Sequence, residues 1–473
     1  MTDKTRKTVV ISTSFGETPD GRRLILFPSR WTAGSVTKSK PFAFYPYELA
    51  YLSSLLKRDL PKDVYQVKMI DPNLLGMSVE ETKVWLDELR PDYLVMEPSA
   101  VDSPLIFQVF DHCRSRYGTC CIAVGAYARS ASVLCADHAD VVVPGEYEVI
   151  VRDVLLADLQ GADRMAVPGV YPIPRSGLID PNILPWPEDD DVSRIDYTEP
   201  GCDGRMIQFY ASRGCPLACS FCVVPSYYGD RARTWRPRDP ADVAAEIAAL
   251  DQKYRGLFSG IFFNEEAHNS DKEWVAELCR QLIARNLTHL RYDAMCLYYN
   301  FDDELLGLMK QAGYHQIRFG IESFDADVGR SIRKNVRYDQ LTQVLKLAKK
   351  HGMITYGTTM VGAPGSSFES DLETHNLLCH LRNDLGLLEK WQVSIATPQP
   401  GTPFHNQVSA NQELLTDDLS HYNGRQAVAS FKNYSADEIE TMYAIFTKRQ
   451  PVTLEDARNL AAARKSAAQA GGR

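Results

Sequence analysis

The chain has 473 residues, a hydrophobic fraction of 44% and a formal net charge of −9 at pH 7. This length has room for two or three domains with a large buried core. The sequence has no run of about 18 apolar residues, which argues against a membrane span, and its first residues lack the apolar core of a signal peptide. We therefore expect a cytoplasmic protein with reduced thiols. The acidic balance, with no long basic block, argues against nucleic acid as a substrate.

Residues 1–160 alternate short apolar runs with amphipathic segments, a pattern typical of a parallel α/β sheet. We therefore predict an α/β fold that begins with a doubly wound, Rossmann-like domain over residues 1–160. The next segment, 161–200, contains seven prolines and the acidic run 188–191, which predicts a linker. The expected strands of the domain are 24–27, 67–70, 93–96, 120–124 and 141–143, and the expected helices are 47–56, 79–89 and 104–116.

From residue 201 to 405 the alternation resumes with longer units, and six strand–helix repeats predict a partial (β/α)6 barrel of the TIM type. Ligands of such barrels gather at the carboxyl ends of the strands. Residues 406–473 are predicted to form a small helical C-terminal region whose alanine-rich end, from Ala461, is peripheral or disordered. The expected barrel strands are 206–210, 258–263, 290–295, 316–320, 355–361 and 391–396, and the helices are 240–254, 271–285, 302–312, 338–351 and 367–382.

Cys215, Cys219 and Cys222 follow the first barrel strand in the run Arg-Gly-Cys-Pro-Leu-Ala-Cys-Ser-Phe-Cys. A cubane iron–sulfur cluster normally takes four thiolates, so three thiolates on one tight loop leave one iron open to a small molecule. The alternatives are a structural zinc site or three core thiols. Zinc sites close with a fourth Cys or His at short spacing, and neither residue type follows before His268. The spacing therefore predicts a [4Fe-4S] cluster.

This cysteine run, with Phe221 before its last cysteine and the apolar strand 206–210 before the loop, resembles the radical S-adenosylmethionine (SAM) superfamily. In that family the open iron binds the amino and carboxylate groups of SAM, and the reduced cluster cleaves SAM to a 5′-deoxyadenosyl radical. The resemblance implies that Phe221 belongs to the cofactor site. It also implies a low-potential electron donor of the flavodoxin or ferredoxin type, and it leaves a partner reductase open.

The strand ends supply further candidates for SAM binding. The resemblance implies that Asn264 or Glu265, after the second barrel strand, hydrogen-bonds the SAM amino group; an ordinary exposed loop is the alternative. The run Phe-Gly-Ile-Glu-Ser at 319–323 is similar to a signature of one branch of the superfamily. It implies that Glu322, with Ser323 beside it, contacts SAM, and that Arg333 or Lys334 pairs with the SAM carboxylate.

That branch carries an N-terminal cobalamin-binding domain, and the resemblance extends over nearly the whole chain through the motifs at 46–52, 90–92, 124–126, 145–148 and 397–403. Three residues depart from its pattern, since Glu48 replaces a small residue, while Ala126 and Tyr147 replace glycines. A corrin needs close backbone approach, which glycine permits and a tyrosine side chain blocks. We therefore predict a cobalamin-binding-like domain that does not hold cobalamin.

The chain is also similar in length and layout to the radical SAM diol dehydratases of aminoglycoside antibiotic biosynthesis. This resemblance implies hydrogen abstraction from a small polyhydroxylated substrate, such as an amino sugar or pseudosaccharide, followed by loss of water. Glu266, Asp293 or Tyr228 is expected to serve as the acid or base. The alternative is a cobalamin-dependent C-methyltransferase, which the fold favours and residues 48, 126 and 147 disfavour. A third hypothesis, a non-catalytic iron–sulfur or zinc protein, does not explain the polar residues at the strand ends, such as Glu265, Glu322 and Arg333.

Overall fold

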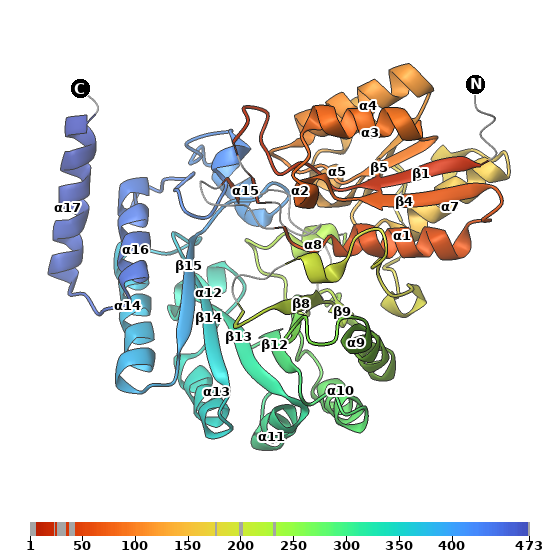
Figure 1. Cartoon of the computed structure of the whole chain (residues 1–473). Helices are drawn as coiled ribbons and strands as arrows, with labels where there is room; N and C mark the ends of the chain where they lie inside the picture. Colours follow the sequence, from red (N-terminus) through yellow and green to blue (C-terminus); the bar gives the residue numbers. More distant parts are fainter. Residues whose placement is uncertain are drawn as a thin grey trace. The chain divides into compact units, whose positions relative to one another are not determined.

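The computed structural model describes residues 6–22, 24–25, 35–36, 43–175, 177–197, 202–229 and 233–471. It divides into two units (Figure 1). The first consists of Met1–Gly201 and Val223–Thr234, and the second of Cys202–Cys222 and Trp235–Arg473. The segment 161–200, predicted as a linker, thus falls within the first unit. None of the helices in the described ranges is long and apolar enough to cross a membrane.

The first unit contains a five-stranded parallel sheet with the strand order β4-β1-β5-β6-β7. Helices lie on both faces, because α1 and α7 pack together on one side and α3 and α4 on the other (Figure 1). This confirms the doubly wound fold, and its order is the flavodoxin-like variant, in which ligands bind beyond the carboxyl ends of the strands. The strands are β1 (Lys7–Ser12), β4 (Tyr65–Ile70), β5 (Tyr93–Met96), β6 (Cys120–Val124) and β7 (Val141–Pro144), and the helices are α1 (Tyr47–Asp59), α2 (Pro72–Leu75), α3 (Val79–Leu89), α4 (Ser103–Tyr117), α5 (Gly125–Ser130), α6 (Ser132–His138), α7 (Glu148–Leu159) and α8 (Val224–Tyr227).

One predicted strand of this sheet is wrong. Within the run 24–27, Leu24–Ile25 forms β2, which pairs antiparallel with β3 (Ser35–Val36) outside the main sheet, and Phe27 lies outside the described residues. The first strand of the sheet is instead β1, whose core residues Val9, Val10 and Ile11 are fully buried. An apolar run is therefore not sufficient to assign a strand to a particular sheet, because pairing depends on distant partners.

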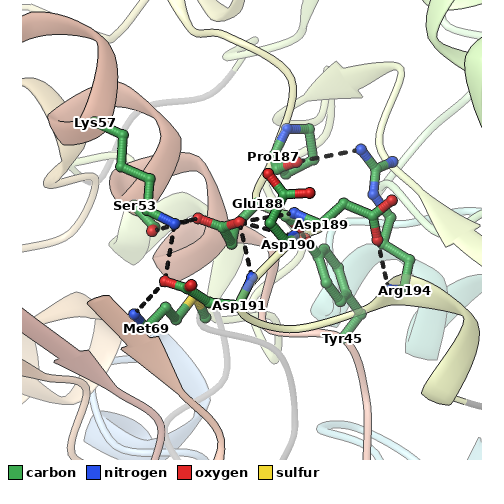
Figure 2. Close-up of polar contacts among 10 residues, drawn as sticks. All are labelled: Tyr45, Ser53, Lys57, Met69, Pro187, Glu188, Asp189, Asp190, Asp191 and Arg194. Atoms are coloured by element: carbon green, nitrogen blue, oxygen red, sulfur yellow. Dashed lines mark hydrogen bonds and ion pairs between the residues drawn. The ribbon is translucent and has the colours of Figure 1, made fainter. Parts of the chain in front are cut away.

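The acidic run 188–191 is anchored to the first unit (Figure 2). One carboxylate oxygen of Glu188 accepts the backbone N–H groups of the three following aspartates at 2.9–3.2 Å. The other oxygen accepts the hydroxyl of Ser53 at 2.8 Å and the ammonium of Lys57, both on α1. Asp191 accepts the backbone N–H of Met69 on β4 at 2.8 Å. These bonds fix a segment whose composition alone suggested a loose connection.

The second unit contains a six-stranded parallel sheet in sequential order, β15-β14-β13-β12-β11-β8, which confirms the predicted partial barrel. Local signals set the helices that lie against it in Figure 1: Asp302 caps the start of α11, and Gly313, with φ 107°, ends it. The strands are β8 (Met206–Phe209), β11 (Gly260–Phe263), β12 (Arg291–Cys296), β13 (Tyr314–Glu322), β14 (Ile354–Val361) and β15 (Lys390–Ile395), and the helices are α9 (Pro240–Lys253), α10 (Lys272–Ala284), α11 (Asp303–Ala312), α12 (Ala326–Ser331), α13 (Tyr338–Lys350) and α14 (Phe368–Cys379).

The C-terminal region is helical, as predicted, and it belongs to the second unit. It comprises α15 (Pro403–Ala410), α16 (Ala436–Lys448) and α17 (Leu454–Gly471). Helix α16 packs on the edge strand β15, so it shields backbone groups that an edge would leave unpaired. The alanine-rich end from Ala461 continues α17 up to Gly471 and is peripheral, since nearly all of the side chains described there are exposed.

Candidate active site

The cysteine loop begins where β8 ends, and the second unit holds its first residues firmly. Arg238, itself 4% exposed, donates its backbone N–H to the carbonyl of Ala211 at 2.9 Å and its guanidinium to the carbonyl of Tyr210 at 3.2 Å. A short antiparallel ladder follows between β9 (Ser212–Arg213) and β10 (Arg236–Pro237). The chain is thus fixed within two residues of Cys215.

The other end of the loop is held through Ser220, which lies between Cys219 and Cys222. Its backbone N–H donates to the carbonyl of Ile332 at 3.0 Å, and its hydroxyl donates to the carbonyl of Ser331 at 3.1 Å. Its own carbonyl accepts the N–H of Phe404 at 3.0 Å. The neighbouring Phe221, predicted at the cofactor site, is partly buried against a cluster that includes Val328, Ile332 and Phe404, so its ring also anchors the loop.

The three thiols lie in surroundings that suit a metal cluster rather than free thiolates. Cys219 is buried, whereas Cys215 and Cys222 are partly exposed. Burial raises the pKa of Cys215 to about 12 and also raises the pKa of Cys219, and bound iron reverses this by stabilising the thiolate. Among the described residues, no group of three or more His, Cys, Asp or Glu side chains is arranged around a single ion. Three thiols on one short loop at the spacing of positions 215, 219 and 222 are what three ligands of a cubane cluster require, so the residues present fit that group.

The end of β11 supplies two carboxylates with different surroundings. Glu265 is 1% exposed, and its carboxylate lies 2.6 Å from Nδ1 of His268, whose Nε2 lies 2.6 Å from the hydroxyl of Tyr314. Glu266 is only partly buried, and its carboxylate accepts the backbone N–H of Gly214 at 3.2 Å, one residue before Cys215. Asn264 ties β11 to β8 through its backbone N–H, which donates to Phe209 at 3.0 Å. The structure thus brings Glu266 beside the cysteine loop and fixes Glu265 beneath it.

The end of β13 places Glu322 next to a buried ammonium group. A register shift between Gly320 and Glu322, with φ 60° at Glu322, redirects this side chain. Its carboxylate accepts from Nζ of Lys334 at 2.7 Å. A Cβ on Gly320 would lie 2.7 Å from the Glu322 carboxylate and still closer to the lysine Nζ, so a side chain at position 320 would force the ends of this pair to shift.

The other two residues predicted near Glu322 have different surroundings. Arg333 is exposed, whereas Lys334 beside it is partly buried. The hydroxyl of Ser323 lies 3.3 Å from that of Thr374 and accepts the backbone N–H of Asp325 at 3.1 Å. The structure therefore pairs Glu322 with Lys334 rather than with Arg333, and it gives Ser323 a role in shaping the turn.

Sequence reasoning did not select Tyr299, in the loop that follows β12. Burial raises the pKa of Tyr299. The charge of Cys215 raises this pKa further and that of Lys334 lowers it, so the Tyr299 phenol interacts with both Cys215 and Lys334. Asn269, after β11, holds this loop by donating to the carbonyls of Leu297 and Tyr299 at 3.0 and 2.7 Å. Its place after a strand end was the only signal that could have identified it.

Two of the three predicted acid or base residues, Glu266 and Asp293, belong to the second unit, and they lie in different places there. Asp293 pairs in register with Gln316, six residues before Glu322 on β13, which is roughly 20 Å along the strand. Burial raises its pKa, and Arg318, 3.8 Å away, opposes this. Tyr228 is buried in the first unit, and Glu266 lies beside the cysteine loop of the second unit.

The carboxyl edge of the first unit is covered by its own residues. Helix α8 packs on α5, and the backbone carbonyl of Tyr227 would be 2.5 Å from a Cβ on Gly145, which follows β7. Tyr147 is fully buried, and Glu48 and Tyr227 are each 3% exposed. Burial raises the pKa of Tyr227, and Glu48 and Glu148 raise it further, so these groups lie together. A corrin at this edge would require α8 to move, and the residues described here do not fit it.

Comparison with known proteins gives concordant results. Residues 209–378 match the family described as the Radical SAM superfamily. The chain is 23% identical over 428 residues to an uncharacterized methyltransferase of Pyrococcus horikoshii, covering 87% of this chain and 89% of the relative. It is 24% identical to the anaerobic magnesium-protoporphyrin IX monomethyl ester cyclase of Rubrivivax gelatinosus, covering 80% and 68%.

Two solved structures share the fold. The radical SAM methyltransferase TsrM from Kitasatospora setae, with cobalamin and a [4Fe-4S] cluster bound, aligns with a TM-score of 0.63 at 14% identity, covering 87% of this chain and 76% of that one. The cobalamin-dependent radical enzyme OxsB, with aqua-cobalamin and SAM bound, aligns with a TM-score of 0.65 at 15% identity, covering 94% and 66%. The likeness extends over both units, which confirms the predicted fold, a Rossmann-like domain followed by a partial barrel.

Proposed function

We propose that this chain, whose residues 209–378 match the Radical SAM superfamily, binds a [4Fe-4S] cluster through Cys215, Cys219 and Cys222 and cleaves SAM reductively. When bound, the cluster supplies the electron that converts SAM to a 5′-deoxyadenosyl radical. The observation that carries this proposal is the meeting of three strand ends at the cysteine loop, through Glu266, Tyr299 and the pair of Glu322 with Lys334.

We propose that Glu266 and Glu322 hold SAM. A carboxylate is a strong acceptor for a cationic amino group, and Glu266 is a partly exposed carboxylate that accepts the backbone N–H of Gly214, one residue before Cys215. Glu265, which we had expected to bind SAM, is occupied by His268. Its proposed role is to fix the loop that presents Glu266. Glutamine at Glu266 should weaken SAM binding while the cluster stays intact.

The reaction that we propose is hydrogen abstraction from a small polyhydroxylated molecule, with 1,2-diol dehydration as the outcome and without cobalamin. Removing hydrogen from a carbon that bears a hydroxyl makes that hydroxyl more acidic, so a nearby base such as Glu266 can take its proton and pass it to the neighbouring hydroxyl, which leaves as water. The α-keto radical that remains takes one electron from the external one-electron donor and one proton from solvent, which gives the ketone. The covered carboxyl edge of the first unit supports a route without cobalamin. The resemblance to aminoglycoside diol dehydratases supports the substrate class.

The second candidate is a cobalamin-dependent radical SAM methyltransferase. The named relatives include an uncharacterized methyltransferase and a cyclase, and both solved neighbours contain cobalamin. By name and fold these comparisons favour the second candidate over dehydration. The covered edge is the specific observation against it.

One anaerobic experiment separates the two candidates. The reconstituted chain is incubated with SAM, a reductant and a panel of amino sugars, with and without hydroxocobalamin. Formation of 5′-deoxyadenosine that does not depend on cobalamin, together with a product lighter by one water, supports dehydration. Stoichiometric cobalamin binding with S-adenosylhomocysteine and a methylated product supports methyl transfer. A chain that assembles no cluster and forms neither nucleoside contradicts both.

A further inference from the structure

The end of α12 and the turn that follows it contact both the cysteine loop and the carboxylate expected to bind SAM. Its residues Ser331 and Ile332 accept the two hydrogen bonds that Ser220 donates. Two residues later, Lys334 donates to Glu322, and its own backbone N–H donates to the carbonyl of Gly329 at 2.9 Å. One short segment therefore fixes both the loop between the second and third cysteines and the side chain of Glu322.

Lys334 carries its charge into this site. Its side chain is 15% exposed and that of Glu322 is 10% exposed, so water screens the pair only weakly. Burial alone would lower the pKa of Lys334, but Glu322 and Cys219 outweigh burial and raise it above the ordinary value, with Cys215 adding to the effect. The 2.7 Å contact with Glu322 holds this ammonium on a segment that also bonds Ser220, between two of the three cysteines.

A fixed cation beside a cluster changes how easily the cluster accepts an electron. Reduction adds one negative charge, and Coulomb attraction to a nearby ammonium stabilises the reduced form more than the oxidised form. Glu322 partly offsets this cation. Lys334 therefore lies where it can act both on the charge of the proposed cluster and on Glu322, the carboxylate proposed to bind SAM.

We propose that Lys334 is a positioning residue that raises the midpoint potential of the cluster and holds Glu322 in place for SAM. This inference rests on the proposed cluster at Cys215, Cys219 and Cys222. The electron itself comes from an external low-potential one-electron donor of the flavodoxin or ferredoxin type, and no proton or bond to Lys334 is exchanged.

The test uses the full chain, reconstituted anaerobically, with K334Q, K334R and a control, K346Q, which removes an exposed lysine from α13. The midpoint potential is measured by electron paramagnetic resonance during a reductive titration without SAM. We expect K334Q to shift the midpoint to a more negative potential, K334R to restore most of it, and K346Q to leave it unchanged. With SAM present, K334Q should bind it at least tenfold more weakly.

A second variant keeps the inference testable if K334Q does not fold. E322Q removes the negative partner and leaves the ammonium, so it should shift the midpoint in the positive direction. A midpoint in K334Q equal to the wild-type value, with a full cluster present, overturns the inference. So does a negative shift in E322Q. Failure of the wild-type chain to assemble a cluster instead contradicts the proposed function, so the two failures are distinguishable.

Discussion

Gly320→Ala tests the arrangement of Glu322 and Lys334 by steric means. The added methyl group would lie 2.7 Å from the Glu322 carboxylate and closer still to Nζ of Lys334, so the ion pair must separate or shift. Overpacking costs about 1–3 kcal/mol, and losing a fully buried ion pair costs about 3–5 kcal/mol. Because both side chains keep 10–15% exposure and the lysine end is flexible, we expect the lower part of these ranges, about 2 kcal/mol.

The assay is thermal unfolding together with SAM affinity, both under anaerobic conditions. For a unit of this size, about 2 kcal/mol corresponds to a fall in Tm of about 4–8 °C. Affinity for SAM should fall as well, because Glu322 loses its position. Gly177→Ala is the matched control, since its added methyl group meets nothing within 4 Å. If G320A has the Tm and SAM affinity of the wild type, the close approach of Lys334 and Glu322 to Gly320 is wrong.

Three further predictions follow from the same structure. Replacing Cys215, Cys219 and Cys222 together with alanine should abolish both reconstituted iron and SAM cleavage, and about four irons per chain in that variant would contradict the cluster assignment. His268→Ala should lower the free energy of unfolding by at least about 3 kcal/mol, because it leaves the Glu265 carboxylate and the Tyr314 hydroxyl buried without this partner. A smaller loss in a denaturant titration would show that His268 contributes little to stability. Burial raises the pKa of Asp371 from 3.8 to about 7, so the folded state binds this proton more tightly than the unfolded state. Stability from this group should fall by about 4 kcal/mol as pH rises from 4 to 7 and level off above 7, and D371N should lose this slope.

The sequence predicted the regular parts of the fold because their signals are local. Strands 93–96 and 120–124 and helix 79–89 match β5, β6 and α3 residue for residue, since apolar period and capping residues such as Ser78 act within a few positions. The misplaced strand at 24–27 and the anchored run at 188–191 have non-local causes. Their partners, Ser35–Val36 and residues of α1 and β4, are distant in the chain, and no periodicity reports such contacts.

The site shows the same division between local and non-local information. Cysteine spacing identified the loop, and strand ends identified the neighbourhood of Glu266 and Glu322. Choosing Glu266 over Glu265 requires the side-chain direction and the partner His268. Pairing Glu322 with Lys334 rather than with Arg333 depends on the turn after α12. The distance of Asp293 from Glu322 depends on the register of β12 on β13. Each of these assignments depends on the direction in which a side chain points. The position of a residue in the sequence does not determine that direction.

Both solved neighbours contain cobalamin, whereas the residues of this chain cover the carboxyl edge of the first unit. A corrin site depends on a few positions at one sheet edge, and the fold alone does not determine them. Glu48 and Tyr147 fill that edge with side chains, and the backbone of Tyr227 lies against Gly145. A change at so few positions alters overall identity very little, yet it can remove a cofactor. The hydrophobic core of this domain, with Val10, Leu94 and Phe110 fully buried, does not include those positions, so the proposed loss of cobalamin is compatible with an intact fold.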